Sequence, residues 1–447
     1  IVHQKAASLF NNLKNAADRM NKKSSAASES LKGFLNSQEL ALSNLHRQSY
    51  VNLELRLLHH DCCTSLDQAG CVLVKGPTPR PDESLAERGI LEEYRAPLLP
   101  LHKESLVDGG LPGILPGPLK PAVSRQPLVH AADSLSRARL MFGTARGETT
   151  ARVILNVYNQ MCMFYGEGYL YIIMETLRDL LPTSPPTQPP QLPFDEEQEA
   201  PDFGVPPAFW VALERVHAAA KSFDRELWGT EKSCRVLQSL IESGDEASVS
   251  FAKGERVHFY AELERRGEAA MLRALDALST HVQWVLVTGG ESMLATGGKR
   301  IMGLGSTTTG GPYAIPAGAS LDTPNSPAVK ALVFCLRHQF VHVQAALTPA
   351  SLANFWTALS MRLYDILVAR LLQHYSVSTV GAVILSRDVE ALRSVAMLTG
   401  NDHSHWDALR ELLTLYMTPP DAIRALFTEG LFDKFSKDRC LVFLSRR

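Results

Sequence analysis

The sequence predicts an all-α protein made of helical bundles that are separated by long disordered loops. Apolar residues recur at intervals of three and four over most of the chain, the period of an amphipathic helix. No stretch alternates polar and apolar residues over the length of a strand, so a major sheet is not expected. Stretches rich in Pro, Gly and Ser interrupt the periodic blocks, and such composition punctuates helices.

The composition is that of a folded protein without a strong overall charge. Of the 447 residues, 45% are hydrophobic and 21% are charged, which is close to the globular average. The 45 Lys and Arg residues nearly balance the 47 Asp and Glu residues. No whole-chain field therefore attracts nucleic acid or anionic lipid, and we expect no nucleic-acid partner. The longest apolar runs are too short to cross a bilayer, so no transmembrane segment is expected.

The cysteines and the N-terminal residues indicate a cytoplasmic protein. The seven cysteines are odd in number and scattered through mostly apolar surroundings, which fits a reducing compartment. The opening stretch lacks the basic region and apolar core of a secretory signal. Because the first residue is Ile1, we interpret the chain as a piece of a longer protein whose natural N-terminal region, a coiled coil or an F-box, is missing.

Breaks in composition divide the chain into seven segments. Periodicity predicts a helical N-terminal segment at 1–76, helical bundle segments at 126–181 and 208–288, and a C-terminal helical bundle at 328–447. Between them lie a Pro/Gly-rich loop at 77–125, a Pro-rich linker at 182–207 and a flexible Gly/Thr/Ser/Pro-rich loop at 289–327.

Two bundle segments are justified by their apolar spacing. The stripe within 128–181 predicts a helical hairpin that bends near Gly166 and Gly168. Pro206 and Pro207 stand where prolines are tolerated before a helix, and the stripe that follows them runs to Leu227. A further stripe at 272–285 predicts a second helix in this block.

The C-terminal bundle has three strong stripes. They predict helices over 329–347, 355–371 and 406–416. The third helix must stop near Pro419 and Pro420, because proline lacks the amide hydrogen and clashes with the preceding turn.

The histidines of the C-terminal bundle include one pair at metal-binding spacing. His338 and His342 stand at i and i+4, which lets two imidazoles reach one zinc ion. Gln339 replaces the glutamate that serves as general base in the helical metalloprotease motif. Both histidines lie opposite the apolar stripe of their helix, so the pattern favours a solvated or partner-facing surface.

Other metal-ligating residue types occur without the spacing of known sites. The cluster His59–Cys63 with Cys71 has adjacent cysteines instead of the paired spacing of structural zinc sites. His403 and His405 lie in a polar turn between helices, where capping is the favoured interpretation. We therefore expect no metal and no cofactor. A metal-dependent hydrolase that uses one of these clusters is the alternative outside the interaction class.

Two glycine-rich patterns fail as catalytic motifs. Gly298 and Lys299 are followed by Arg300 where a phosphate-binding loop has Ser or Thr. Ser306 follows a glycine directly, so it does not form the nucleophile elbow of hydrolases. We expect a flexible loop here and no catalytic residue.

A run of residues in the C-terminal bundle resembles one known family. It comprises a helix with the sequence of 361–367, an aromatic-serine turn and small glycine patch within 371–382, and an Asp-Val pair at 387–389. This order resembles the C-terminal region of the Sec-ten-like subunit of the exocyst, also called exocyst complex component five. The Leu-rich helix and proline-containing stop at 409–423 are similar to the same family. Patchy similarity extends upstream to about Leu128.

The chain departs from that family at particular positions. Ala382 replaces the second glycine of the patch, and Leu392 stands where an aromatic residue is usual. We therefore interpret the chain as a divergent member. Recyclin-type F-box proteins share the same C-terminal region, and an F-box adaptor in membrane recycling and ubiquitination remains the alternative.

The resemblance implies an architecture, a role and partners. The implied architecture is an elongated rod of stacked helical bundles without an active site. The implied role is that of a non-catalytic subunit of the exocyst, which holds secretory vesicles at the plasma membrane before fusion. The implied partners are other exocyst subunits, especially the Sec-fifteen-like subunit, and indirectly a Rab-type GTPase on vesicles. Membrane association would be peripheral, through the complex, at vesicles and sites of exocytosis.

The polar faces of the C-terminal helices supply a candidate partner-binding surface. Because the resemblance is densest there, we expect the basic residues of those faces to meet an acidic partner. These residues are Arg362, Arg370, His374, Arg387 and Arg393.

Overall fold

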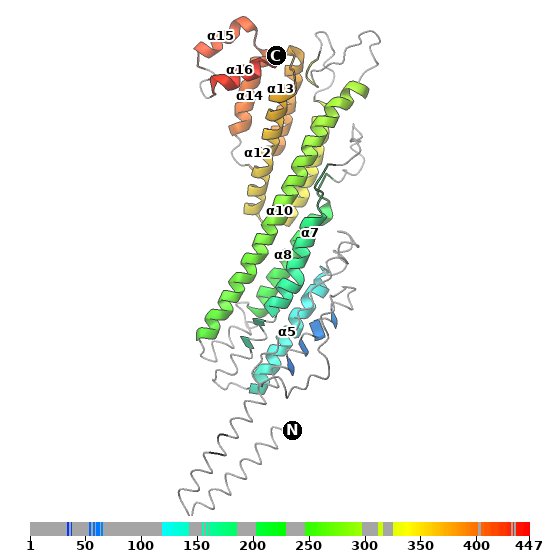
Figure 1. Cartoon of the computed structure of the whole chain (residues 1–447), viewed down its shortest axis with the longest axis vertical. Coiled ribbons are helices and arrows are strands. Elements are labelled where there is room, and N and C mark those ends of the chain that lie inside the picture. Colours follow the sequence, from blue (N-terminus) through cyan, green and yellow to red (C-terminus); the bar gives the residue numbers. More distant parts are fainter. Residues whose placement is uncertain are drawn as a thin grey trace, which may run out of the picture. The chain divides into compact units, whose positions relative to one another are not determined.

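A computed structural model describes the conformation of much of the chain, and every regular element in it is a helix (Figure 1). None of the described residues lies in a β-strand, which confirms the all-α prediction. No described helix is both long and apolar enough to span a membrane. The described residues are 34, 37, 53, 54, 57, 58, 60–62, 64, 65, 119–142, 154, 155, 158, 159, 161–185, 203–228, 246–296, 312–315, 325–400, 404–430, 432 and 435–447.

The elements follow one another along the chain with the labels of Figure 1. They are α5 (Pro121–Phe142), the π-helix η1 (Met163–Leu170), α7 (Tyr171–Leu180), α8 (Pro207–Leu227), α10 (Glu246–Thr296), α11 (Pro327–Ala346), α12 (Pro349–Gln373), α13 (Thr379–Ala396), the 3₁₀ helix η2 (Met397–Thr399), α14 (Ser404–Met417), α15 (Pro420–Thr428) and α16 (Lys437–Leu444).

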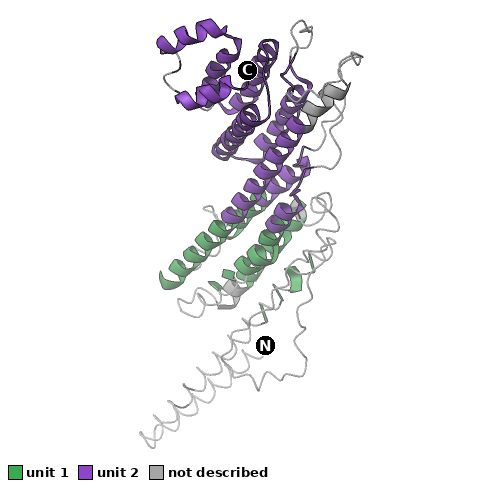
Figure 2. Ribbon diagram, turned by 45° about the horizontal axis from the view of Figure 1, so that its top comes forward, with its two compact units in different colours: residues 1–105, 116–173, 217–263 green, residues 106–115, 174–216, 264–447 purple. Residues whose placement is uncertain are grey.

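The chain divides into two compact units (Figure 2). Unit 1 contains residues 1–105, 116–173 and 217–263, and unit 2 contains residues 106–115, 174–216 and 264–447. The helices α7, α8 and α10 each contribute residues to both units. The seven segments proposed from the sequence describe how helix and loop alternate along the chain, and their boundaries remain a proposal.

Unit 1 has an aromatic core. The rings of Tyr165 and Phe223 stack with centroids 5.5 Å apart, and Phe223 stacks on Phe259 at 4.7 Å. All three side chains are buried. The Tyr165 hydroxyl donates to the carbonyl of Ser124 at 2.9 Å, and the Tyr171 hydroxyl donates to the carbonyl of Phe259 at 3.0 Å. These bonds offset the cost of burying the phenol groups.

The hairpin bend predicted at Gly166 and Gly168 is wrong. The chain stays helical from Met161 to Leu180, and both glycines lie inside η1. Six of the eight residues of η1 are buried. A Cβ at Gly166 would lie 3.0 Å from the Tyr171 ring and 3.1 Å from the Phe259 ring. The glycine therefore lets two aromatic rings approach the backbone, and it does not reverse the chain.

Unit 2 incorporates the end of the predicted Pro-rich linker into its core. Phe203, Gly204 and Val205 are all buried, so these residues of the proposed linker pack into the core. Gly204 has φ +74°, the left-handed region that favours glycine. A Cβ there would lie 2.8 Å from Cε1 of His281. The start of α8 at Pro207 is as predicted.

The buried segment at 203–205 also contacts a buried side-chain amide, that of Gln339. The Gln339 side chain accepts a hydrogen bond from the Trp210 indole at 3.0 Å and donates one to the carbonyl of Val205 at 2.8 Å. Only 1% of Gln339 is exposed. Both ends of the amide are therefore satisfied, and the residue joins α8 to α11 within unit 2.

The helices of the C-terminal bundle are delimited by caps. Ser326, Thr348 and Ser378 precede α11, α12 and α13, and each side-chain oxygen accepts a hydrogen bond from a backbone amide in the first turn. Proline follows the first two caps, at the position where its missing N–H costs nothing. These signals explain why the connections between the three helices are short.

The predicted stop of the helix over 406–416 is confirmed. Helix α14 ends at Met417, and Pro420 begins α15. The Arg447 guanidinium donates to the carbonyl of Thr418 at 2.6 Å, which satisfies an acceptor at the end of α14. The last residue of the chain thus helps to terminate a helix that lies 30 residues earlier in the sequence.

The predicted flexible loop at 289–327 is structured at two places. Helix α10 continues to Thr296, beyond the predicted boundary. Tyr313 is buried, with 2% of its surface exposed. The glycine and proline content of the segment did not indicate that Tyr313 is buried, because a single buried side chain produces no apolar periodicity.

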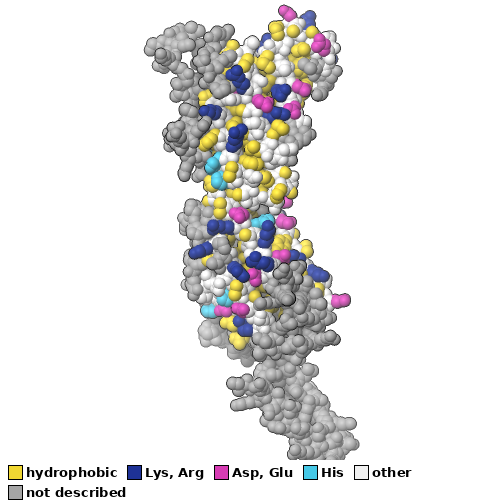
Figure 3. All heavy atoms as spheres, turned by 180° about the vertical axis from the view of Figure 1, so that it is seen from behind, with side chains coloured by type: hydrophobic (Ala, Val, Ile, Leu, Met, Phe, Trp, Pro, Cys, Tyr) yellow, Lys and Arg dark blue, Asp and Glu magenta, His cyan; other side chains and the backbone are white. Residues whose placement is uncertain are grey.

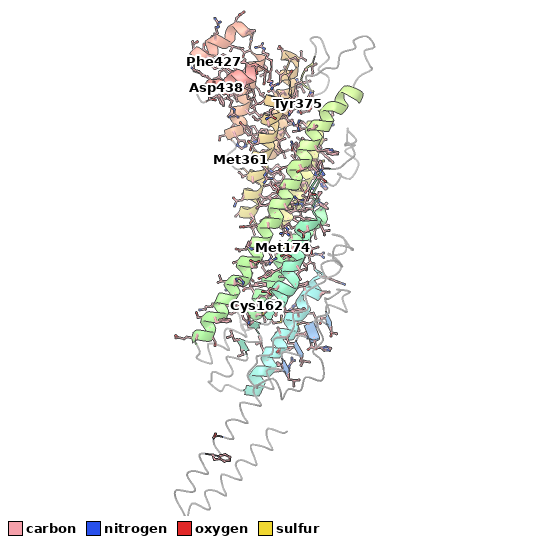
Figure 4. All side chains as sticks on the ribbon, in the orientation of Figure 1. Cys162, Met174, Met361, Tyr375, Phe427 and Asp438 are labelled. Carbon is pink, nitrogen blue, oxygen red and sulfur yellow. The ribbon has the colours of Figure 1, made fainter. Side chains whose placement is uncertain are left out.

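The stripe of α12 can be tested by one substitution on each face. Leu363 is 3% exposed, whereas Met361 on the same helix is 54% exposed (Figure 4). We expect Leu363→Asp to lower the free energy of unfolding by several kcal/mol, because it buries a carboxylate without a partner. Met361→Asp should change it by less than about 0.5 kcal/mol. Urea unfolding followed by circular dichroism measures both, and equal losses would contradict the assigned faces.

Candidate interaction surface

The Asp-Val pair of the C-terminal bundle lies in the core. Asp388 on α13 is fully buried. Its carboxylate accepts hydrogen bonds from the Ser326 backbone amide at 2.9 Å, the Asn325 side chain at 3.2 Å and the Tyr313 hydroxyl at 2.9 Å. Burial raises the pKa of this carboxyl above its ordinary value, and the three hydrogen bonds offset part of that effect. Asp388 therefore joins α13 to the start of α11 and to the segment around Tyr313.

The glycine patch provides room for the same segment. The Tyr313 carbonyl accepts hydrogen bonds from the Ser378 amide at 3.1 Å and from the Ser378 hydroxyl at 3.3 Å. A Cβ at Gly381 would overlap the Tyr313 carbonyl oxygen and lie 2.7 Å from the carbonyl carbon. Residue 381 must therefore lack a side chain for Tyr313 to bind. Ala382, the departure noted in the sequence, is itself buried at 1% exposure.

The aromatic of the aromatic-serine turn is also a packing residue. The Tyr375 ring meets the Tyr313 ring edge-on at 5.6 Å, and its hydroxyl donates to the carbonyl of Leu286 at 3.0 Å. The Val377 amide donates to the carbonyl of Arg446 at 2.8 Å. Tyr375, Gly381 and Asp388, three of the residues that carry the family resemblance, therefore hold the bundle together.

Two of the five candidate basic residues are engaged within unit 2. The Arg362 guanidinium forms an ion pair with Asp276 of α10. Arg393 pairs with Asp407 of α14 at 3.0 Å and with Glu390 at 3.2 Å. These two arginines link helices, so they are poor candidates for a partner-binding role.

The other three candidates are solvent-facing to different degrees. Arg387 and His374 are exposed, and Arg370 is partly exposed. Within the part of the chain that the structure describes, Arg370 and Arg387 form no ion pair. Arg370 and His374 lie near the end of α12, whereas Arg387 lies on α13. The structure thus does not unite the five residues in one surface that is free for a partner.

The histidine pair lies on the outside of α11. The rings of His338 and His342 meet edge-on with centroids 4.7 Å apart, and both are partly exposed. Burial and the neighbouring His338 lower the pKa of His342. Among the described residues, no three His, Cys, Asp or Glu side chains are grouped so as to hold a metal ion.

The remaining sequence candidates are only partly described. Cys62 is buried, with its thiol facing the carbonyl of Pro127 at 3.9 Å. His405 packs its ring against Tyr364 at 5.0 Å, in the first turn of α14. The rest of these candidates lie outside the described residues, and they are His59, Cys63, Cys71, Gly298, Lys299, Arg300, His403 and Ser306.

Comparison with protein families gives a match that covers this bundle. Residues 313–447 match the family described as exocyst complex component Sec10-like, alpha-helical bundle. Over these residues the chain is similar to the Sec10-like exocyst family. The matched region begins at Tyr313, the residue that contributes the phenol to the Asp388 network. No curated protein matches the chain.

The Sec10-like match confirms the resemblance that was inferred from the C-terminal motifs. It also shows what sequence reasoning missed. Tyr313 was assigned to a loop, and Gln339 was considered only as a replacement for a catalytic glutamate. The sequence signal for Tyr313 was an isolated aromatic residue in a Gly/Pro-rich segment, and the signal for Gln339 was a polar residue beside the apolar stripe of α11.

The Asp388 network predicts a pH-dependent difference in stability between the wild type and Asp388→Asn. Asp388→Ala leaves three hydrogen-bond donors without an acceptor, and each unsatisfied buried donor costs about 1–3 kcal/mol. We therefore expect this variant to lower the free energy of unfolding by several kcal/mol. Asp388→Asn keeps the shape of the side chain and removes the titration. Because the native pKa is raised, the native state binds the proton more tightly than the unfolded state.

The stabilisation due to protonated Asp388 is therefore complete below the ordinary pKa of about 4 and is lost as the pH rises through the raised value. The melting temperature of the wild type minus that of Asp388→Asn should fall over this range. Thermal unfolding of both proteins at a series of pH values measures the difference. A difference that grows with pH would contradict the assignment.

The close approach at Gly381 predicts opposite effects for two identical substitutions. Gly381→Ala should destabilise the Sec10-like bundle by more than about 1 kcal/mol, because the Tyr313 carbonyl and its hydrogen bonds must shift. Gly254 is exposed in the N-terminal part of α10, where a Cβ would meet nothing within 4 Å, so Gly254→Ala should stabilise the protein by about 0.5–1 kcal/mol. Chemical denaturation tests both, and a stabilising Gly381→Ala would refute the contact.

Proposed function

We propose that this protein is a subunit of the exocyst vesicle-tethering complex. As a non-catalytic scaffold, it would hold secretory vesicles at the plasma membrane before fusion. The observation that carries the proposal is the Sec10-like family match over residues 313–447. Its partners would be other exocyst subunits, the Sec-fifteen-like subunit among them, and through them a Rab-type GTPase on the vesicle. The protein would act from the cytoplasm and be recruited to sites of exocytosis.

The chemistry of the bundle supports a scaffold role. Several of its buried polar groups form internal hydrogen bonds. The Trp356 indole donates to the carbonyl of Val395 at 2.9 Å, and the Trp406 indole donates to the Ser360 hydroxyl at 2.9 Å. Asp388, the buried carboxylate, is likewise bonded to three protein donors. Groups that are committed in this way fix helix positions, which is what a protein needs if it works by presenting helix faces.

The experiment that tests this function is affinity purification from cells of the source organism. The tagged wild-type chain should recover exocyst subunits, measured by quantitative mass spectrometry. Gly381→Ala should recover fewer of them because it disturbs the Sec10-like bundle, whereas Gly254→Ala should recover as many as the wild type. Recovery of ubiquitin-ligase components without exocyst subunits would favour the recyclin-like adaptor. Recovery of neither would refute both proposals.

A further inference from the structure

Helix α11 presents an outward-facing stripe with the spacing of a helix-docking surface. Lys330, Phe334, Arg337, Val341 and Gln344 follow one another at intervals of four, three, four and three residues. This spacing places them on one side of the helix, opposite its buried face. Val341 is 62% exposed, and Phe334 is partly exposed. The whole of α11 contains no Asp or Glu.

Helix α13 continues this surface at the side of α11. The Arg337 guanidinium lies 3.5 Å from the Ser394 hydroxyl, and the Ser326 amide lies 2.9 Å from Asp388. The later residue of α11 contacts the later residue of α13, so the two helices run parallel where α11 up to Arg337 meets the second half of α13. Arg387 and Ser394 are two helical turns apart, so they share the side of α13 that meets Arg337.

These residues form a surface that we name the α11–α13 seam. The Arg387 side chain is exposed, and Val383 lies one turn before it and is partly exposed. The members of the seam are Lys330, Phe334, Arg337 and Val341 of α11 and Val383, Arg387 and Ser394 of α13.

Arg337 and Arg387 give the seam positive charge, and among the described residues neither has an ion pair. The exposed acidic residue of α13 closest in sequence to Arg387 is Glu390, and it is paired with Arg393 at 3.2 Å and Arg410 at 4.0 Å. Asp388 is buried and accepts hydrogen bonds from protein donors. The seam therefore combines exposed apolar side chains with guanidinium groups, and an acidic partner complements it.

We infer that the α11–α13 seam binds an acidic amphipathic helix of another exocyst subunit. This inference rests on the proposed function. The apolar face of such a helix would cover Val341 and Phe334, and its flanking carboxylates would pair with Arg337 and Arg387. An amphipathic helix commonly binds by placing its apolar face against apolar side chains of neighbouring helices. Bidentate pairing of guanidinium and carboxylate adds orientation to the contact.

The arrangement favours a protein helix over a membrane surface. Anionic lipid surfaces are recognised by clusters of about four to eight Lys and Arg residues. The seam has three cations, spaced along two helices and separated by apolar side chains. Figure 3 shows hydrophobic, basic and acidic side chains interspersed on one face of the molecule. The apolar and basic residues of the seam suit a partner that alternates apolar and acidic groups.

The seam can be tested with charge reversal and a matched control. Arg337→Glu combined with Arg387→Glu should reduce recovery of exocyst subunits about tenfold, and Val341→Asp should do so independently. The control combines Arg370→Glu on α12 with Arg424→Glu on α15, which makes the same change in charge away from the seam. Circular dichroism and thermal unfolding establish that each variant folds as the wild type does.

Each outcome of the purification has a distinct meaning. Loss of a subunit with the seam variants but not with the control supports the seam. Undiminished recovery with both seam variants overturns the seam and leaves the proposed function standing. No exocyst subunit recovered by the wild type overturns the proposed function as well. Reduced binding of the seam variants to phosphatidylserine vesicles, with unchanged subunit recovery, would replace the protein partner by a membrane.

Carbodiimide cross-linking identifies the occupant directly. Arg337→Lys and Arg387→Lys keep the positive charge and introduce amines that a carbodiimide joins to carboxylates in direct contact. In the purified complex we expect cross-links from these positions to Asp or Glu residues of one other subunit. Cross-links between two copies of this chain would show instead that the seam is a self-association surface, and an absence of cross-links from both positions would overturn the inference.

Discussion

The C-terminal bundle depends on one buried carboxylate. Asp388 receives three hydrogen bonds from residues that precede it by more than 60 positions in the chain, and no other single side chain joins α13, the N-terminus of α11 and the Tyr313 segment among the described contacts. An ionisable group without exposure is expensive unless its lone pairs are satisfied. The donors of Asn325 and Ser326 that satisfy this carboxylate lie directly before α11, so they also fix where α11 begins. One interaction therefore both offsets the desolvation of Asp388 and sets the position of α11.

The Asp388 interaction also explains the residues around it. Tyr313 can supply its phenol only if its backbone approaches α13 closely, and Gly381 permits that approach. Ser378 serves twice, because its hydroxyl caps α13 and bonds the Tyr313 carbonyl. Tyr313, Ser378 and Asp388 are thereby committed to structure. What remains for a partner is the outer surface, where Val341 and Arg387 are exposed.

The sequence predicted those features that depend on local spacing. The stripes of α11, α12 and α14, the start of α8 at Pro207 and the stop before Pro419 were all correct, because helical period and proline chemistry act within a few residues. The helix over 272–285 was recognised only as part of α10, which begins at Glu246. The candidate partner-binding surface stays a prediction, and charge pattern alone did not reveal that Arg362 and Arg393 have acidic partners within the chain.

The sequence by itself therefore determined the fold class, the positions of helices α11, α12 and α14 and the family resemblance of the C-terminal bundle, because each of these is encoded in short-range pattern. Only the tertiary structure decided which polar residues are structural and which remain available. Tyr313, Gln339 and Asp388 acquire their roles from partners that are 62 to 134 positions away in the chain. Neither spacing nor composition records such contacts, since they form only when the helices pack.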